Sequence, residues 1–122
     1  MALSTSLLDA RVTNIVVVET VLTATGQNDI TAEPSTLHTA TFANGSGQDA
    51  YIFFYDSRAG ILGQTPTLTF FVVAGQTRSY IFPDGIIFST GICVRCTNSE
   101  AQNSNTTPTG AAVVSRFTAI RN

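Results

Sequence analysis

The chain has 122 residues, an apolar fraction of 43%, a charged fraction of 11% and a formal net charge of −2. This length accommodates one domain with one hydrophobic core, and the apolar fraction excludes a wholly disordered chain. The six basic residues are arginines that stand singly, and no apolar run reaches the roughly 20 residues of a bilayer-spanning helix, so neither nucleic acid nor a membrane is an expected partner.

The N-terminal segment is predicted to be an extended arm. Residues 1–11 are small and polar apart from one apolar pair, Leu7 and Leu8. They carry neither the cationic start nor the long apolar centre of a secretion signal, so we expect synthesis in a cytoplasm. A loop rich in Gly, Asn, Asp and Pro follows at 24–35. The whole segment 1–35 is therefore interpreted as an arm that contains one strand and contacts a neighbouring subunit.

The strand in this segment is predicted at 12–23, VTNIVVVETVLT, because β-branched residues dominate it. Its central residues, Ile15 to Val18, show little alternation between apolar and polar side chains. That pattern is typical of a strand with both faces covered.

From residue 36 onward, short apolar segments alternate with turn signals. Extended segments are predicted at 36–44, 50–56, 67–74, 77–82, 86–88, 91–97 and 111–120. The Gly75-Gln76 pair predicts a hairpin, and the sequence Pro83-Asp84-Gly85 predicts a turn. About seven or eight strands at spacings of roughly ten residues, without helical periodicity, predict an all-β fold. We expect an antiparallel β-sandwich or jelly-roll-like domain at 36–122, with a partly open barrel as the alternative.

The segment 50–56 places apolar side chains on both of its faces. Tyr51, Phe53 and Tyr55 share one side of an extended strand, and Ile52 and Phe54 share the other. Two apolar faces predict that part of the outer face meets another chain, although a long loop folded over that face is an alternative. Arginine suits such contacts because its fork pairs with carboxylates bidentately. The predicted interface residues are Leu7, Leu8, Arg11, Tyr51, Phe53, Tyr55 and Arg58.

No pattern of reactive residues predicts catalysis. Cys93 and Cys96 form a lone C-x-x-C in a predicted strand, where residues three apart point to opposite faces, so we expect two reduced, buried cysteines. His38 lies within an alternating strand and is interpreted as structural. Three aspartates at strand ends or turns are predicted to cap backbone groups: Asp49, Asp56 and Asp84. No catalytic, cofactor-binding or metal-binding residue is predicted, and we expect neither an enzyme nor a small-molecule substrate.

Two stretches of the chain carry a family resemblance. They are YDSRAGILGQTPTLTFFVVAGQT and FPDGIIFSTGICVRCTNSEAQNSNTTPTGAAVVSRF, within roughly residues 51–117. With their G-x-T-P loop, A-G-x-T turn and F-P-x-G-I-x-F-S-T-G core, they resemble small virion proteins of tailed bacteriophages and prophages. The resemblance implies a non-enzymatic virion structural protein, specifically a capsid cement or decoration protein that binds the assembled head lattice and stabilises it.

The same resemblance implies the partners and the location. The partners are the major capsid protein and the protein itself, as a homotrimer, and the arm at 1–35 contacts either a neighbouring subunit or the capsid. The location is the capsid surface after synthesis in the host cytoplasm. One alternative is a tail or fibre-associated virion subunit. Another is a carbohydrate-binding β-module with Tyr51, Tyr55 and Tyr80 as stacking platforms.

Overall fold

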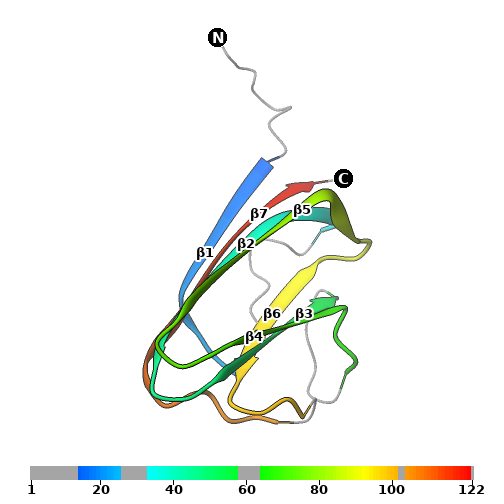
Figure 1. The fold of residues 1–122 in the computed structure, drawn as a ribbon. Helices are drawn as coiled ribbons and strands as arrows, with labels where there is room; N and C mark the ends of the chain where they lie inside the picture. Colours follow the sequence, from blue (N-terminus) through cyan, green and yellow to red (C-terminus); the bar gives the residue numbers. More distant parts are fainter. Residues whose placement is uncertain (1–13, 26–32, 58–63, 102–103, 122) are drawn as a thin grey trace.

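Antiparallel strands form two facing sheets in the computed structural model, which describes residues 14–25, 33–57, 64–101 and 104–121 (Figure 1). The strands within these residues are β1 (Asn14–Leu22), β2 (Ser35–Ser46), β3 (Ala50–Asp56), β4 (Leu68–Val72), β5 (Thr77–Phe88), β6 (Ile92–Thr97) and β7 (Gly110–Arg121). One sheet has the order β1-β7-β2-β5, and the other has the order β4-β3-β6. The predicted fold class, an all-β antiparallel sandwich, is confirmed.

Strand β1 is an integral part of the four-stranded sheet. It pairs antiparallel with β7, and Leu22 at its end is buried in the core. The strand predicted at 12–23 is therefore present, but it is one of the strands of the sandwich and not part of a separate arm. The predicted division into an arm at 1–35 and a domain at 36–122 differs from this arrangement. The pairing of β1 with β7 crosses the predicted boundary and makes β1 part of the domain. Leu7, Leu8 and Arg11 lie outside the described residues.

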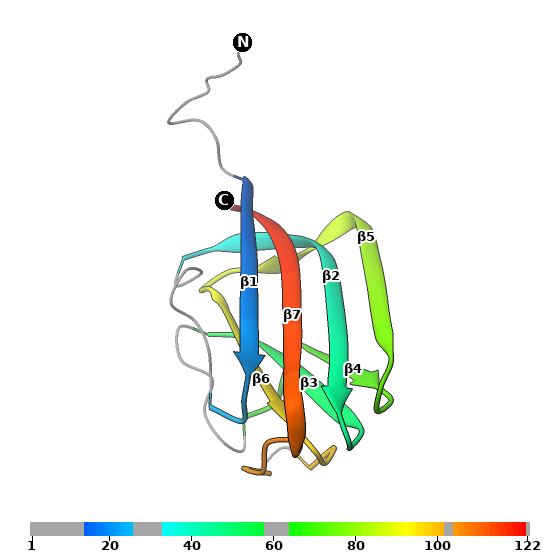
Figure 2. The same ribbon diagram turned by 90° about the vertical axis from the view of Figure 1, so that its left-hand side faces the viewer.

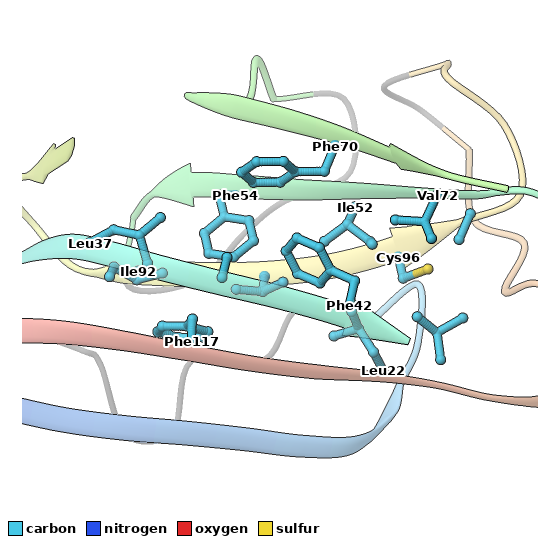
Figure 3. Packing of buried hydrophobic residues seen from close by; sticks show 14 of the residues in the cluster. Leu22, Leu37, Phe42, Ile52, Phe54, Phe70, Val72, Ile92, Cys96 and Phe117 are labelled. Carbon is cyan, nitrogen blue, oxygen red and sulfur yellow. The ribbon is translucent and has the colours of Figure 1, made fainter. Parts of the chain in front are cut away.

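The hydrophobic core fills the space between the two sheets and is rich in phenylalanine. Phe54 on β3 lies near its centre, with its ring centroid 5.9 Å from that of Phe42, 5.4 Å from Phe70 and 5.5 Å from Phe117. Figure 3 shows Phe42 and Phe54 next to each other between β2 and β3. All three contacts are edge-to-face, a favourable geometry for aromatic pairs. The two sheets are thus joined by one continuous aromatic cluster.

The turn predicted at Gly75-Gln76 exists, but it does not make a hairpin. Gln76 N–H donates to the carbonyl of Val73 at 3.0 Å, and Gly75 has a φ of +78°, the left-handed conformation that favours glycine. The turn connects β4 in one sheet to β5 in the other. The backbone of Asn44 on β2 bonds to both turn residues and holds the chain against β2. The hairpin prediction is therefore wrong.

The sequence Pro83-Asp84-Gly85 is a bulge inside β5, so the prediction of a turn between two strands is also wrong. Residues 82–85 stand opposite His38 on β2, where the register shifts. Gly85 has a φ of +76°, and a Cβ at this position would clash with the Cγ2 of Thr36. Because β5 is at the edge of its sheet, Pro83 can lack an N–H without removing a hydrogen bond between strands.

The two cysteines form no disulfide bond and are buried on opposite sides of β6. Cys96 belongs to the core between the sheets, whereas Cys93 packs with Phe53 and Tyr55 on the other side. Burial raises the pKa of the Cys96 thiol to about 12. The prediction of two unbridged, buried cysteines on opposite faces is confirmed.

Aspartates cap two of the connections between the sheets. The carboxylate of Asp56 accepts hydrogen bonds from the backbone N–H groups of Ser89 at 3.0 Å and Thr90 at 2.7 Å. Asp49 accepts a backbone N–H of the β4–β5 connection at 3.1 Å. The capping prediction is confirmed for these two residues, whereas Asp84 lies within β5 and not in a turn.

The cap at Asp56 predicts a loss of stability in acid. Burial raises the pKa of Asp56, but hydrogen bonds from Thr90, Ser89 and Gly91 together outweigh it and hold the pKa below 3.8. A lowered pKa in the folded state stabilises the fold above the unfolded-state pKa, and this contribution is lost as the pH falls through the folded-state pKa. We therefore expect the stability of the wild-type protein to decrease as the pH drops below about 4.

Replacing Asp56 with asparagine removes this contribution. We expect Asp56→Asn to lower the free energy of unfolding by about 1 kcal/mol at neutral pH and to weaken its decrease in acid. Urea unfolding at about pH 7 and about pH 3 measures both effects. Asp84→Asn is the matched control, because Asp84 is exposed within β5. If the asparagine variants have the same pH dependence, the cap at Asp56 contributes nothing.

Candidate interaction surface

The outer face of the four-stranded sheet is the candidate functional site. Figure 2 shows β1, β7, β2 and β5 side by side, with this face toward the viewer. Successive side chains of a strand point to opposite faces, so every second residue lies on the outer face. The pairing register aligns these residues in rows across the sheet, one of Val16, Thr118, Thr39 and Ile81 and the next of Val18, Arg116, Thr41 and Ser79. We call the outward side chains of these rows, with Ile87 on β5, the outer face.

Apolar side chains are exposed at both margins of the outer face. On β1, Val16 and Val18 are 54% and 50% exposed, and on β5, Ile81 and Ile87 are 76% and 69% exposed. The solvent-facing side of an antiparallel sheet usually carries polar residues. Apolar side chains gathered on one face indicate contact with another molecule.

Hydroxyl groups occupy the centre of the outer face. The Oγ1 atoms of Thr39 and Thr118 are 2.7 Å apart, and the hydroxyl oxygens of Thr41 and Ser79 are 3.0 Å apart. Because these hydroxyls bond to one another, covering them removes fewer hydrogen bonds to water than covering isolated polar groups. In the two rows given above, Arg116 is the one charged side chain. The free energy needed to remove water from the outer face is therefore small over most of its width.

The interface residues predicted on β3 are largely covered by the chain itself. Phe53 and Tyr55 are each 1% exposed and pack with Cys93, while Tyr51 is half-buried beside them. The alternative interpretation, a chain segment folded over this face, accounts for the burial of Phe53 and Tyr55. Contact of Tyr51 with a partner stays a prediction, and Arg58 lies outside the described residues.

The residue that holds this cover in place is Arg95 on β6, which is itself only 1% exposed. Its Nε donates to the Tyr55 hydroxyl at 2.8 Å, and its Nη1 donates to the carbonyls of Ala24 at 3.2 Å and Ser104 at 2.8 Å. Its guanidinium carbon is 5.2 Å from the centroid of the Phe53 ring. Arg95 thus ties the segment after β1 and the segment after β6 to the three-stranded sheet.

Sequence reasoning missed this role of Arg95. The residue is one of six singly placed arginines, and no Asp or Glu stands next to it in the sequence. The one available signal is its position between apolar residues in ICVRCT, a strand whose six residues are all buried. An arginine in such a strand indicates that both faces of the strand are covered.

Two of the three tyrosines proposed as carbohydrate platforms, Tyr55 and Tyr80, are engaged in contacts within the protein. Tyr55 is buried, and its hydroxyl accepts the hydrogen bond from Arg95. The ring of Tyr80 lies 4.7 Å from that of Phe70 and 6.2 Å from that of Phe42. A stacking platform needs an exposed ring face. These contacts therefore weigh against the carbohydrate-binding alternative.

Comparison with known proteins gives little guidance. No family model and no curated protein matches the chain. Among solved structures, a chain of the Bacillus endospore appendages, described as a novel family of disulfide-linked pili, is similar at 12% sequence identity and a TM-score of 0.45. The similarity covers 88% of this chain and 84% of that chain, and at this level it does not bear on function.

No helix within the described ranges is long and apolar enough to cross a membrane. In the same ranges, no three His, Cys, Asp or Glu side chains gather as metal ligands do.

Proposed function

We propose that the protein is a non-enzymatic structural subunit that binds other proteins through the outer face of its four-stranded sheet. The observation that carries this proposal is the exposure of β-branched apolar side chains on both sides of a hydroxyl centre, such as Val18 on β1 and Ile81 on β5. Protein interfaces combine an apolar part with hydrogen-bonding groups and are depleted of charge at their centre. The outer face has the apolar and the hydrogen-bonding groups, and Arg116 is the one charged side chain in its two rows.

The specific form of the proposal is a capsid cement or decoration protein of a tailed bacteriophage. It is supported by the sequence resemblance within residues 51–117 and by the charged fraction of only 11%. A protein that binds the assembled head lattice better than the free capsid subunits stabilises the lattice by mass action. Binding sites linked in one oligomer strengthen this effect, because the second contact becomes intramolecular. The partner in this proposal is the major capsid protein.

A sedimentation experiment tests the proposal. Purified protein is mixed with expanded capsids of the phage whose genome encodes the chain, and the bound fraction is measured after centrifugation. The double variant Ile81→Lys, Ile87→Lys places two charges on the outer face and is expected to lower the affinity about tenfold or more. Thr69→Lys is the matched control, because Thr69 is an exposed strand residue on the other sheet. Equal binding by the double variant and the wild type would exclude the outer face.

Antibody labelling of whole particles distinguishes the head from the tail. Label on the heads is the result that we expect from a decoration protein. Label confined to the tails supports the alternative of a tail or fibre-associated subunit and contradicts the capsid form of the proposal. Particles without any label contradict both.

A further inference from the structure

The two edges of the four-stranded sheet differ in their protection against strand addition. At the β5 edge, Pro83 lacks an N–H, and the bulge that ends at Gly85 distorts the strand. Proline and bulges are devices that prevent edge strands from pairing with other chains. At the β1 edge, the sequence NIVVVETVL contains no proline, lysine or arginine. From Asn14 to Glu19, where its pairing with β7 is continuous, the β1 edge is therefore unprotected by these devices.

The backbone directions of β1 follow from hydrogen bonds elsewhere in the sheet. The hydrogen-bonding groups of successive residues in an antiparallel strand point alternately to its two sides. Asn44 N–H donates to the carbonyl of Gln76 at 2.8 Å, so the backbone of Asn44 faces β5. Three residues earlier in β2, Thr41 consequently faces β7, where Arg116 lies opposite it.

The alternation continues across β7 to β1. Because Arg116 faces β2, the next residue, Phe117, faces β1, where Val17 lies opposite it. Val17 thus bonds to β7, and the amide and carbonyl groups of Val16 and Val18 point away from the sheet. Within the described residues, no strand lies on that side of β1 (Figure 2). A row of outward backbone donors and acceptors is a template for a further strand.

We propose that the β1 edge pairs with the β1 edge of a second copy of this chain. The two strands run antiparallel and are centred on Val17, so that Val16 of each copy exchanges backbone hydrogen bonds with Val18 of the other. The pairing joins two four-stranded sheets into one and places the valines of both copies side by side on the outer face. Cross-strand pairs of β-branched side chains favour this contact.

The register follows from where β1 is regular. Its pairing with β7 is continuous from Asn14 to Glu19, and a shift follows. The Glu19 carboxylate accepts the N–H of Val21 at 3.2 Å, which occupies the backbone beyond the regular stretch. Centring the pair on Val17 uses this stretch and sets Glu19 opposite Ile15 of the other copy. The two carboxylates therefore do not face each other, and like-charge repulsion across the pair is avoided.

The properties of the β1 edge favour a second copy of this chain as its partner. A two-fold pairing brings the same surface of each copy together, and the stretch from Asn14 to Val18 carries no charge to oppose it. This inference rests on the proposed function for its biological role and deepens it by naming one partner. It replaces the homotrimer implied by the sequence resemblance, because a two-fold edge pair closes after two copies.

Light scattering of the full chain tests the pairing. The wild type is expected to show twice the chain mass of 12.9 kDa. Val16→Pro removes the outward N–H of Val16, as Pro83 does on the other edge, and is expected to halve that mass. Val16→Thr is the control, because it keeps both the N–H and the β-branched shape, and we expect it to remain a dimer. A wild type that is monomeric or trimeric at every soluble concentration overturns the proposal.

Amide hydrogen exchange is measured on the wild type, so its result does not depend on whether a variant folds. In the proposed dimer, the amides of Val16 and Val18 are protected as well as that of Val17. A dimer in which Val16 and Val18 exchange rapidly contradicts the proposal, because another surface then joins the copies. A monomer in which they are protected also contradicts it, because the chain then covers its own edge.

These outcomes are separable from those of the capsid experiment. A monomer that decorates capsids contradicts the edge pairing and leaves the proposed function in place. A dimer that is paired through β1 but fails to bind capsids supports the edge pairing and contradicts the proposed function.

Discussion

Replacing Arg95 with alanine is expected to lower the free energy of unfolding by about 3–5 kcal/mol. The side chain is 1% exposed, so its removal leaves a cavity beside the ring of Phe53. The Tyr55 hydroxyl and the carbonyls of Ala24 and Ser104 also lose a donor. Each buried polar group without a partner costs about 1–3 kcal/mol, although the two carbonyls can recover part of this from water. Urea unfolding measures the difference.

Two further variants separate the packing of Arg95 from its hydrogen bonds. Arg95→Met keeps most of the side-chain volume without any donor, so we expect a smaller loss than for alanine. Tyr55→Phe is expected to cost about 1 kcal/mol or more in the wild type and less in the Arg95→Met background, where the hydroxyl already lacks its donor. Equal costs in the two backgrounds would mean that the bond between Arg95 and Tyr55 contributes no stability. An alanine variant as stable as the wild type would show that the cover over β3 does not depend on Arg95.

The strands of this fold are predictable from the sequence, but their distribution between two sheets is not. β-branched and aromatic runs predict β1, β2, β3, β4, β6 and β7 with small differences in their bounds. The turn at Gly75 is also predictable, because a positive φ at a glycine depends on the local sequence and not on distant residues. Whether the flanking strands pair with each other depends on distant residues. Here the backbone of Asn44 on β2 holds the start of β5 in the opposite sheet from β4.

The same limit applies to Pro83 and Gly85. In a sequence, a proline two residues before a glycine is typical of a turn. In an edge strand, the missing N–H of proline has no partner to lose, and glycine accommodates the bulge that passes His38. The position of β5 at the edge decides between these outcomes, and that position is set by the whole sheet order.

The candidate site was only partly foreseeable. The weak alternation at Ile15 to Val18 indicated a strand covered on both faces, and the structure leaves Val16 and Val18 exposed on the outer face. The aromatic face of β3 was interpreted as a surface for a partner, whereas segments of the same chain cover Phe53 and Tyr55. The periodicity of apolar residues identifies which side chains are expected to be buried. It does not identify what supplies the cover, because that depends on loops whose own sequences are polar and irregular.

Replacing Phe54 with alanine is expected to lower the free energy of unfolding by about 3–5 kcal/mol. Phe54 is fully buried on β3, and its ring contacts reach the other sheet at Phe42, Phe88 and Phe117. Truncation therefore removes contacts between the sheets and leaves a cavity that rigid strands on both sides cannot close. Phe54→Leu keeps most of the volume and is expected to cost less than about 2 kcal/mol. Urea unfolding of both variants gives the two values.

Phe71→Ala is the matched control for this prediction. Phe71 lies on the neighbouring strand β4, but it is 44% exposed and its ring stacks only beside that of Tyr51 at 5.1 Å among the described aromatic pairs. The same atoms are removed, yet no enclosed cavity forms, so we expect a loss of about 1 kcal/mol or less. Similar losses at Phe54 and Phe71 would contradict the assignment of the core to the space between the sheets. A large difference would show that enclosure by both sheets, and not the phenyl group itself, is what makes Phe54 stabilising.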